Sequence, residues 1–204
     1  MTATATPSTQ TPTSTATRTA SPTVTVHSGA TVWLTGLPSS GKSTIADAVA
    51  AALRADGRRV EVLDGDAVRE TLSAGLGFTR ADRETNIDRI GFVADLLARN
   101  GVLVLAAVIS PYGAARDRVR ARHARSGAPF LEVHVATPLA TCAARDVKGL
   151  YGRQARGELV GLTGVDDAYE PPLAPDLRVD TRGRTVQATA ADVLDLLRRT
   201  GVLR

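Results

Sequence analysis

The sequence is poor in several features, and each shortage narrows the class of protein. It contains a single cysteine, Cys142, which excludes an internal disulfide framework and fits a reducing compartment. No apolar run approaches the roughly 18 residues that a membrane-spanning helix requires. We therefore predict a soluble, cytoplasmic protein with no membrane partner.

Lysine is also scarce, since Lys42 and Lys148 are the only two among 25 basic residues. A compact, rotatable ammonium differs in use from a planar guanidinium, and both lysines fall in segments that we assign to phosphate handling. The alternative for Lys148 is an ordinary solvated lysine. The net charge is +4, with the arginines spread along the chain, so a polyanionic small molecule fits as well as nucleic acid. We predict a small-molecule substrate and no nucleic-acid partner.

The composition changes near residue 30. Residues 1–30 are mostly Thr, Ala, Ser and Pro with almost no large apolar side chain, so they bury too little surface to offset the entropy of ordering. We predict a disordered tail there; a transit peptide is the alternative, but the amphipathic arginine pattern is missing. Residues 31–204, in a chain of 204 residues that is 43% hydrophobic, are predicted to form one globular domain.

The most specific stretch, GLPSSGKST at positions 36–44, fits G-x-x-x-x-G-K-[ST] at every required position. Backbone N–H groups of such a loop form a nest for phosphate oxygens, Lys42 adds a point charge, and Ser43 supplies a hydroxyl for Mg²⁺. A β-prone run precedes the loop and apolar residues follow it at helical spacing. A P-loop for ATP and Mg²⁺ is therefore predicted. Its ATP-binding residues are Gly36, Leu37, Pro38, Ser39, Ser40, Gly41, Lys42, Ser43 and Thr44.

Two carboxylates follow the second predicted strand, residues 60–63, in the sequence Asp64-Gly65-Asp66. Open α/β sheets place their ligands at the carboxyl ends of strands. Asp64 and Asp66 are therefore candidates for contact with Mg²⁺ and for accepting the proton of a hydroxyl nucleophile. The alternative, which can hold at the same time, is an Asp-Gly turn in which Asp66 is the N-cap of a helix from Ala67.

A continuous apolar run over residues 102–109 predicts a strand buried on both faces of a parallel sheet. It ends in Ser110 rather than in an acid, so the Mg²⁺-associated carboxylate is expected to be Asp64. Arg83 and Asn86, three apart, share a helical face and suit an anion and a base edge. The arginines at 116–125 are predicted to form a solvated helical face. None of His27, His123 and His134 is assigned to catalysis or metal binding, because no partner spacing accompanies them.

Residues 146–157 are basic and punctuated by glycine, which is typical of a mobile lid that closes cations over phosphates. An ordinary surface loop is the alternative. The long connection from Gly161 to Pro172 is interpreted as a binding loop. The last strand is predicted at 177–180, with a closing helix marked by apolar residues from Val186 to Leu197.

Taken together, the motifs GLPSSGKST, LDGDAVR, GFTRADRETNI, VISPY, RDVKGLY and GLTGVDDAYEPP resemble those of the adenylylsulfate kinase family from Thr31 to the C-terminus. The resemblance implies a P-loop kinase fold with a five-stranded parallel sheet flanked by helices and a mobile lid. It implies transfer of the ATP γ-phosphoryl group to the 3′-hydroxyl of adenylyl sulfate, giving 3′-phosphoadenylyl sulfate. It also implies a homodimer, with an association with ATP sulfurylase as a further expected partner.

The resemblance also implies site residues. Catalytic candidates are Lys42, Asp64, Asp66 and Ser110, the last being the family's serine for a possible phosphorylated intermediate, against which we favour direct transfer. Metal candidates are Ser43 and Asp64. Cys142 and Arg145 complete the expected ATP-binding set. The expected substrate contacts are Asp66, Arg69, Phe78, Arg83, Asn86, Ile109, Ser110, Lys148, Gly161 and Leu162.

Leu162 departs from the family pattern, because an aromatic residue is usual there. With Phe78 on one face and an aromatic on the other, the substrate adenine would be sandwiched, and loss of one partner costs on the order of 1 to 3 kcal/mol. Two rival functions follow: a P-loop kinase of another small-molecule hydroxyl, or a non-catalytic nucleotide-binding module. The presence of Lys42, Ser43 and Asp64 argues against the second.

Overall fold

The computed structural model describes residues 1–2 and 29–203. The predicted tail and His27 therefore lie almost wholly outside the described residues, and the first strand begins at Ala30. The strands are β1 (Ala30–Thr35), β2 (Val60–Asp64), β3 (Leu103–Ala107), β4 (Phe130–Val135) and β5 (Leu177–Val179). The helices are α1 (Lys42–Ala55), α2 (Gly65–Glu70), α3 (Arg80–Ala98), α4 (Gly113–Ser126), α5 (Leu139–Arg145), α6 (Leu150–Ala155) and α7 (Val186–Arg199).

The five strands pair in parallel in the order β2-β3-β1-β4-β5, which confirms the predicted sheet. β1 lies at the centre and is buried at all six of its positions. Because all strands are parallel, their carboxyl ends meet at one edge of the sheet. The segments that follow β1, β2 and β3 therefore converge there, and these segments carry the P-loop, the two aspartates and Ser110.

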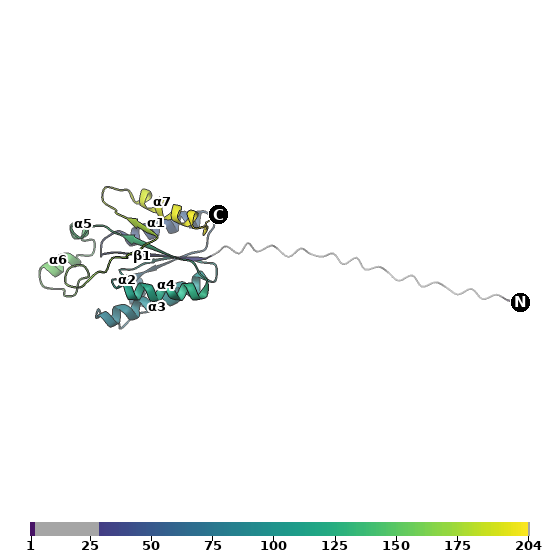
Figure 1. Ribbon diagram of the computed structural model, residues 1–204, viewed down its shortest axis with the longest axis horizontal. Coiled ribbons are helices and arrows are strands. Elements are labelled where there is room, and N and C mark those ends of the chain that lie inside the picture. Colours follow the sequence, from purple (N-terminus) through teal and green to yellow (C-terminus); the bar gives the residue numbers. More distant parts are fainter. Residues whose placement is uncertain (3–28, 204) are drawn as a thin grey trace.

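Helices cover both faces of the sheet, with α1 and α7 on one face and α2, α3 and α4 on the other (Figure 1). Successive side chains of β1 alternate between these layers, as the pleat of a strand requires. Val32 and Leu34 pack with apolar residues of α1 and α7, whereas Trp33 packs with Ile90 and Val119 from α3 and α4. The two cores thus hold both ends of the P-loop in fixed positions.

One sequence expectation needs correction. Arg116 does not lie on a solvated face of α4, because it is only 4% exposed and its guanidinium pairs with Glu132 of β4 at 2.8 Å. The segment 146–157, predicted as a lid, contains the helix α6, on which Tyr151 is buried, and its closure as a lid stays a prediction. Within the part of the chain that the structure describes, no helix combines the length and apolarity needed to cross a membrane.

Candidate active site

The P-loop connects the central strand β1 to α1, as predicted. Gly41 adopts φ 103°, a left-handed conformation that favours glycine, and a Cβ at Gly36 would lie 2.5 Å from the carbonyl oxygen of Val135. No side chain in the described part of the chain caps the start of α1, so its first N–H groups are available to an anion. The Oγ of Ser39 is buried and, among the described residues, has no hydrogen-bond partner. A polyphosphate would satisfy these groups.

Lys42 is buried and folds back over its own loop. Its Nζ donates to the carbonyl oxygens of Gly36 at 3.0 Å and Leu37 at 2.7 Å. Burial lowers the pKa of Lys42 to about 7; the charge of Lys148 acts in the same direction, whereas Cys142 and Asp64 partly oppose the shift. An anion in the loop would restore the charge of this ammonium group, because a nearby negative charge favours the protonated form.

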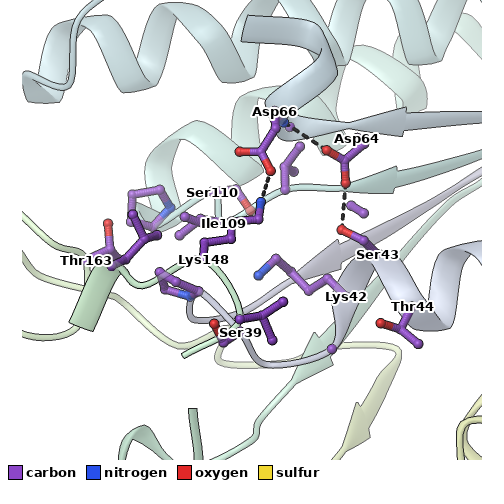
Figure 2. A pocket seen from close by; sticks show the side chains of 18 of the residues that line it. Ser39, Lys42, Ser43, Thr44, Asp64, Asp66, Ile109, Ser110, Lys148 and Thr163 are labelled. Carbon is purple, nitrogen blue, oxygen red and sulfur yellow. Dashed lines mark hydrogen bonds and ion pairs between the residues drawn. The ribbon is translucent and has the colours of Figure 1, made fainter. Parts of the chain in front are cut away.

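The carboxylate of Asp64 joins the P-loop to β2. Its Oδ2 accepts a hydrogen bond from Ser43 Oγ at 2.6 Å, and its Oδ1 accepts one from the backbone N–H of Asp66 at 2.9 Å (Figure 2). Asp64 is therefore the N-cap of α2, and the alternative in which Asp66 caps this helix is wrong. The carboxylate of Asp66 instead pairs with the ammonium of Lys148 (Figure 2).

A cavity of about 600 Å³ opens at this edge of the sheet and is lined by Asp64, Asp66 and Lys148 together with two sets of residues. The first set, the P-loop wall, comprises Pro38, Ser39, Gly41, Lys42, Ser43, Thr44, Ile45, Arg145, Thr181, Arg184, Thr185, Val186 and Thr189. The second set, the Phe78 wall, comprises Arg69, Phe78, Arg83, Asn86, Ile87, Ile109, Ser110, Pro111, Leu159, Val160, Gly161, Leu162 and Thr163. One cavity thus brings together the predicted site residues except Gly36, Leu37, Ser40 and Cys142, which do not line it.

The Phe78 wall presents an aromatic ring with cations close to it. Phe78 is 64% exposed, and the guanidinium of Arg69 lies 4.5 Å from its ring centroid. Arg69 is held by its hydrogen bond to the carbonyl oxygen of Gly77 at 3.0 Å. Nearby, the Oδ1 of the buried Asn86 has no hydrogen-bond donor among the described residues. An exposed ring and an unpaired amide oxygen together suit a planar base with a donor on its edge.

Arg83 is buried and already has several partners. It donates to the carbonyl oxygens of Phe78 at 2.9 Å and Gly161 at 2.7 Å, and it pairs with Asp167 at 3.3 Å. It also donates to Thr163 Oγ1 at 3.1 Å. Arg83 therefore ties the start of α3 to the predicted 161–172 binding loop, besides lining the cavity.

Ser110 lines the cavity, but its hydroxyl is engaged inside the protein. Its Oγ accepts a hydrogen bond from Trp33 Nε1 at 3.0 Å and donates one to Thr35 Oγ1 at 2.8 Å. The residue is 1% exposed and has φ 41°, in the left-handed region. This arrangement gives the hydroxyl a structural role and leaves it poorly placed to accept a phosphoryl group.

Two predicted contacts lie deeper than expected. Cys142 is fully buried, is not part of the cavity lining, and packs against Tyr151 and Leu162, so its contact with ATP stays a prediction that the cavity lining does not support. Leu162 does line the cavity, yet it is 6% exposed and belongs to the same apolar cluster. Arg145 lines the P-loop wall, where it donates to Thr181 Oγ1 at 2.7 Å.

Sequence reasoning missed the part of the P-loop wall that follows β5. This part comprises Thr181, Arg184, Thr185, Val186 and Thr189. Its only signal in the sequence was its position directly after the last predicted strand, at the edge where ligands bind. Val147 and Val160, which are 77% and 83% exposed and also line the cavity, were missed as well.

A parallel sheet with β1 at its centre, a P-loop leading into α1, and a carboxylate bonded to the P-loop serine define the class of P-loop kinases. Comparison with known proteins narrows the class. The family model for adenylylsulphate kinase matches residues 28–180. The chain therefore belongs to the adenylylsulphate kinase family.

Individual relatives agree with this assignment. A probable adenylyl-sulfate kinase of Synechocystis sp. is 55% identical over 75% of this chain and 84% of its own length. An adenylyl-sulfate kinase of Myxococcus xanthus is 53% identical over 86% of this chain and 95% of its own. The solved Mycobacterium tuberculosis APS kinase in complex with AMPPNP and APS is 46% identical, covers 83% of this chain and 98% of its own, and superposes with a TM-score of 0.81.

Proposed function

We propose that the protein transfers the γ-phosphoryl group of ATP directly to the 3′-hydroxyl of adenylyl sulfate, giving 3′-phosphoadenylyl sulfate. One observation carries the proposal: a single cavity joins the P-loop to the exposed ring of Phe78 and the unpaired amide of Asn86. The first set of groups suits a nucleoside triphosphate, and the second suits an adenine-containing acceptor. The names of the relatives support the same pair of substrates.

The P-loop wall holds ATP. Its phosphates take the free N–H groups at the start of α1 and the Oγ of Ser39, while Lys42 exchanges the carbonyls of Gly36 and Leu37 for phosphate oxygens. The segment after β5 and Arg145 extend this wall away from the P-loop, where the rest of the nucleotide would lie. Positioning and charge neutralisation are the main tasks in phosphoryl transfer.

Ser43 and Asp64 fit a magnesium ion. Their oxygens lie 2.6 Å apart at the cavity, and no cluster of three or more acidic, histidine or cysteine side chains suited to a metal exists among the described residues. Mg²⁺ usually takes only one or two protein ligands, with water and substrate phosphates supplying the rest. Bound there, the ion would neutralise charge on the phosphates that the P-loop orients.

The Phe78 wall holds adenylyl sulfate. Its adenine stacks on Phe78 and donates to the free oxygen of Asn86, and Arg69, beside the ring, is placed to pair with an anionic group. Arg83 contributes its remaining N–H groups and shapes the wall through Gly161. Lys148 contacts the sulfonucleotide after the ion pair between Lys148 and Asp66 breaks.

Asp66 is the group that orients the 3′-hydroxyl and accepts its proton. Both oxygens of Asp64 already accept hydrogen bonds, whereas among the residues that the structure describes the carboxylate of Asp66 has only the exposed Lys148 as partner. The 3′-oxygen forms a bond to the γ-phosphorus as the bond to the β–γ bridging oxygen breaks and ADP leaves. Because the hydroxyl of Ser110 has two internal partners, no phosphoserine is needed.

The proposal is tested by measuring ADP release with MgATP and adenylyl sulfate beside parallel reactions with AMP and adenosine, with the products identified by mass. We expect robust release with adenylyl sulfate and a product heavier by one phosphoryl group. ADP release with AMP or adenosine but not with adenylyl sulfate would instead show a cavity adapted to another hydroxyl acceptor. Leu162, where the family usually has an aromatic residue, favours that second candidate. ATP binding with no turnover of any acceptor would indicate a non-catalytic module.

The homodimer, the association with ATP sulfurylase and the cytoplasmic location remain predictions. Light scattering on the purified chain tests the first, since a dimer doubles the measured mass. Mixing with a sulfurylase of the same source in the same experiment tests the second, and fractionation of source cells tests the third.

A further inference from the structure

The backbone at the end of β3 is held in an unusual conformation. Ser110 has φ 41°, which a residue with a side chain adopts only when its surroundings hold it there. Two contacts act on its hydroxyl, from Trp33 Nε1 at 3.0 Å and to Thr35 Oγ1 at 2.8 Å. A third acts on its carbonyl oxygen, which accepts a hydrogen bond from Arg116 Nη1 at 2.7 Å.

The guanidinium of Arg116 contacts three separate segments. Besides Ser110 after β3, it donates from Nη2 to the carbonyl oxygen of Glu170 at 2.7 Å, and its Nε pairs with Glu132 of β4 at 2.8 Å. Arg116 and Glu132 are 4% and 7% exposed, so the pair is buried. A planar fork with fixed donor directions can hold these partners at once in one geometry.

The two carbonyls belong to two of the segments that form the Phe78 wall. Ser110 lies between Ile109 and Pro111, which both line the cavity, and Glu170 lies near the end of the 161–172 loop, whose first residues, 161–163, line the cavity. The same segments meet again where the N–H of Glu170 donates to the carbonyl oxygen of Pro111 at 2.8 Å. Arg116 itself does not line the cavity.

We propose that Arg116 is a positioning residue that sets the Phe78 wall by fixing Ser110 and the 161–172 loop relative to the sheet. The proposal rests on the function proposed above, since that wall is assigned to adenylyl sulfate. Loss of the fork should weaken the use of the acceptor while leaving the P-loop wall, and hence ATP, largely unaffected.

Arg120 provides a matched control on the same helix. It also pairs with Glu132, at 3.0 Å, but its other ionic partner is Asp176 at 3.4 Å. Its guanidinium lies 5.0 Å from the ring centroid of Phe130, and no hydrogen bond or ion pair in the described part of the chain joins it to Ser110 or Glu170. Arg116→Lys and Arg120→Lys therefore make the same chemical change beside the same carboxylate. Only the first removes a fork that holds the cavity segments.

Trp33 supplies a readout that needs no substrate. It is the only tryptophan in the sequence, it is fully buried, and its indole N–H donates to Ser110. Its emission spectrum therefore reports on the position of the Ser110 hydroxyl. We expect a shifted emission in Arg116→Lys and an unchanged one in Arg120→Lys.

The test measures both KM values, kcat and Trp33 emission for the two variants of the full chain. Arg116→Lys should raise the KM for adenylyl sulfate about ten- to a hundredfold, as displaced positioning groups do, with the KM for ATP within about twofold of the original. Arg120→Lys should change neither. Equal rises in both KM values, matching effects of the two variants, or no change in Arg116→Lys would each overturn the proposal.

Two further measurements test the proposal if Arg116→Lys does not fold or if the original chain does not use adenylyl sulfate. Should Arg116→Lys fail to fold, Glu132→Gln keeps Arg116 but removes the charge that orients it, and the same KM split must appear at smaller size for the proposal to stand. Should the original chain not phosphorylate adenylyl sulfate, the proposed function fails. The Trp33 comparison would still decide whether Arg116 fixes Ser110.

Discussion

The two walls of the cavity are built in different ways. The phosphate-binding part of the P-loop wall is one continuous stretch, residues 38–45, in which glycine geometry and the start of α1 create the phosphate nest, and Arg145 and the segment after β5 complete this wall. The Phe78 wall is assembled from α2, α3, the end of β3 and the 161–172 loop, and is held by buried arginines such as Arg83 and Arg116. A local wall depends on backbone conformation, whereas an assembled wall depends on side-chain bridges between distant segments.

Substitution of the charged residues beside the bound phosphates should have the largest effect on turnover. Lys42→Ala and Asp64→Asn are each expected to lower kcat by about a thousandfold, because Lys42 neutralises charge on the phosphates and Asp64 is proposed to hold the Mg²⁺ that also does so. Folding should persist, which circular dichroism can check, since a buried lysine with a lowered pKa contributes little to stability. Near-normal turnover in Asp64→Asn would remove Asp64 from the mechanism.

Arg83→Ala should have the next largest effect and should act on one wall only. The change removes a buried cation and its links to Phe78, Gly161 and Asp167. We expect the KM for adenylyl sulfate to rise about ten- to a hundredfold, with a much smaller rise for ATP. Steady-state kinetics with each substrate varied in turn measures the difference, and equal rises would show that Arg83 serves both walls.

Substitutions of Phe78 and Leu162, both in the Phe78 wall, should affect different quantities: the first acceptor binding, the second the stability of the fold. Phe78 is 64% exposed, so Phe78→Ala should hardly change the free energy of unfolding yet weaken acceptor binding by about 1 to 3 kcal/mol, the value of a base stacked on an aromatic ring. Leu162 is buried, so Leu162→Ala should lower the free energy of unfolding by about 2 to 5 kcal/mol.

Denaturant unfolding and acceptor titration of the same two variants check this pair. A large loss of stability in Phe78→Ala would mean that the ring packs in the core. A loss of acceptor affinity in Leu162→Ala without loss of stability would mean that Leu162 contacts the substrate after all.

The smallest expected effect concerns protons. Lys42 has a pKa of about 7 in the free protein, and bound phosphates should raise this pKa. At pH 8, where the free ammonium is mostly deprotonated, nucleotide binding should therefore be coupled to uptake of a proton by Lys42. At pH 6, where Lys42 is already protonated, the uptake should be close to zero. Affinity for MgATP should therefore fall as pH rises above 7, by at most about tenfold per pH unit for one proton. Calorimetry in buffers of different ionisation enthalpy measures the uptake. Lys42→Met is the control, and an unchanged uptake in it would assign the protons elsewhere.

Several positions show how far sequence reasoning reached. The strand before the P-loop, the P-loop and the helix after it were predicted correctly because their signals are local: apolar run, glycines at fixed spacing, helical periodicity. Arg116 was placed on a solvated face because helical spacing does not reveal that β4 brings Glu132 against it. The segment after β5 was missed because only the folded sheet brings Thr181 beside the P-loop, where its Oγ1 lies 3.2 Å from the carbonyl oxygen of Ser40.

The sequence by itself determined the phosphate nest, the order of the strands along the chain, and the family, because these depend on residue types at short spacing. The tertiary structure decided that Asp64 rather than Asp66 caps α2, that the Ser110 hydroxyl is used inside the protein, and that Leu162 packs into a core. The physical reason is that a side chain's role depends on the partners that meet it. Those partners come from segments that only the parallel sheet brings to one edge.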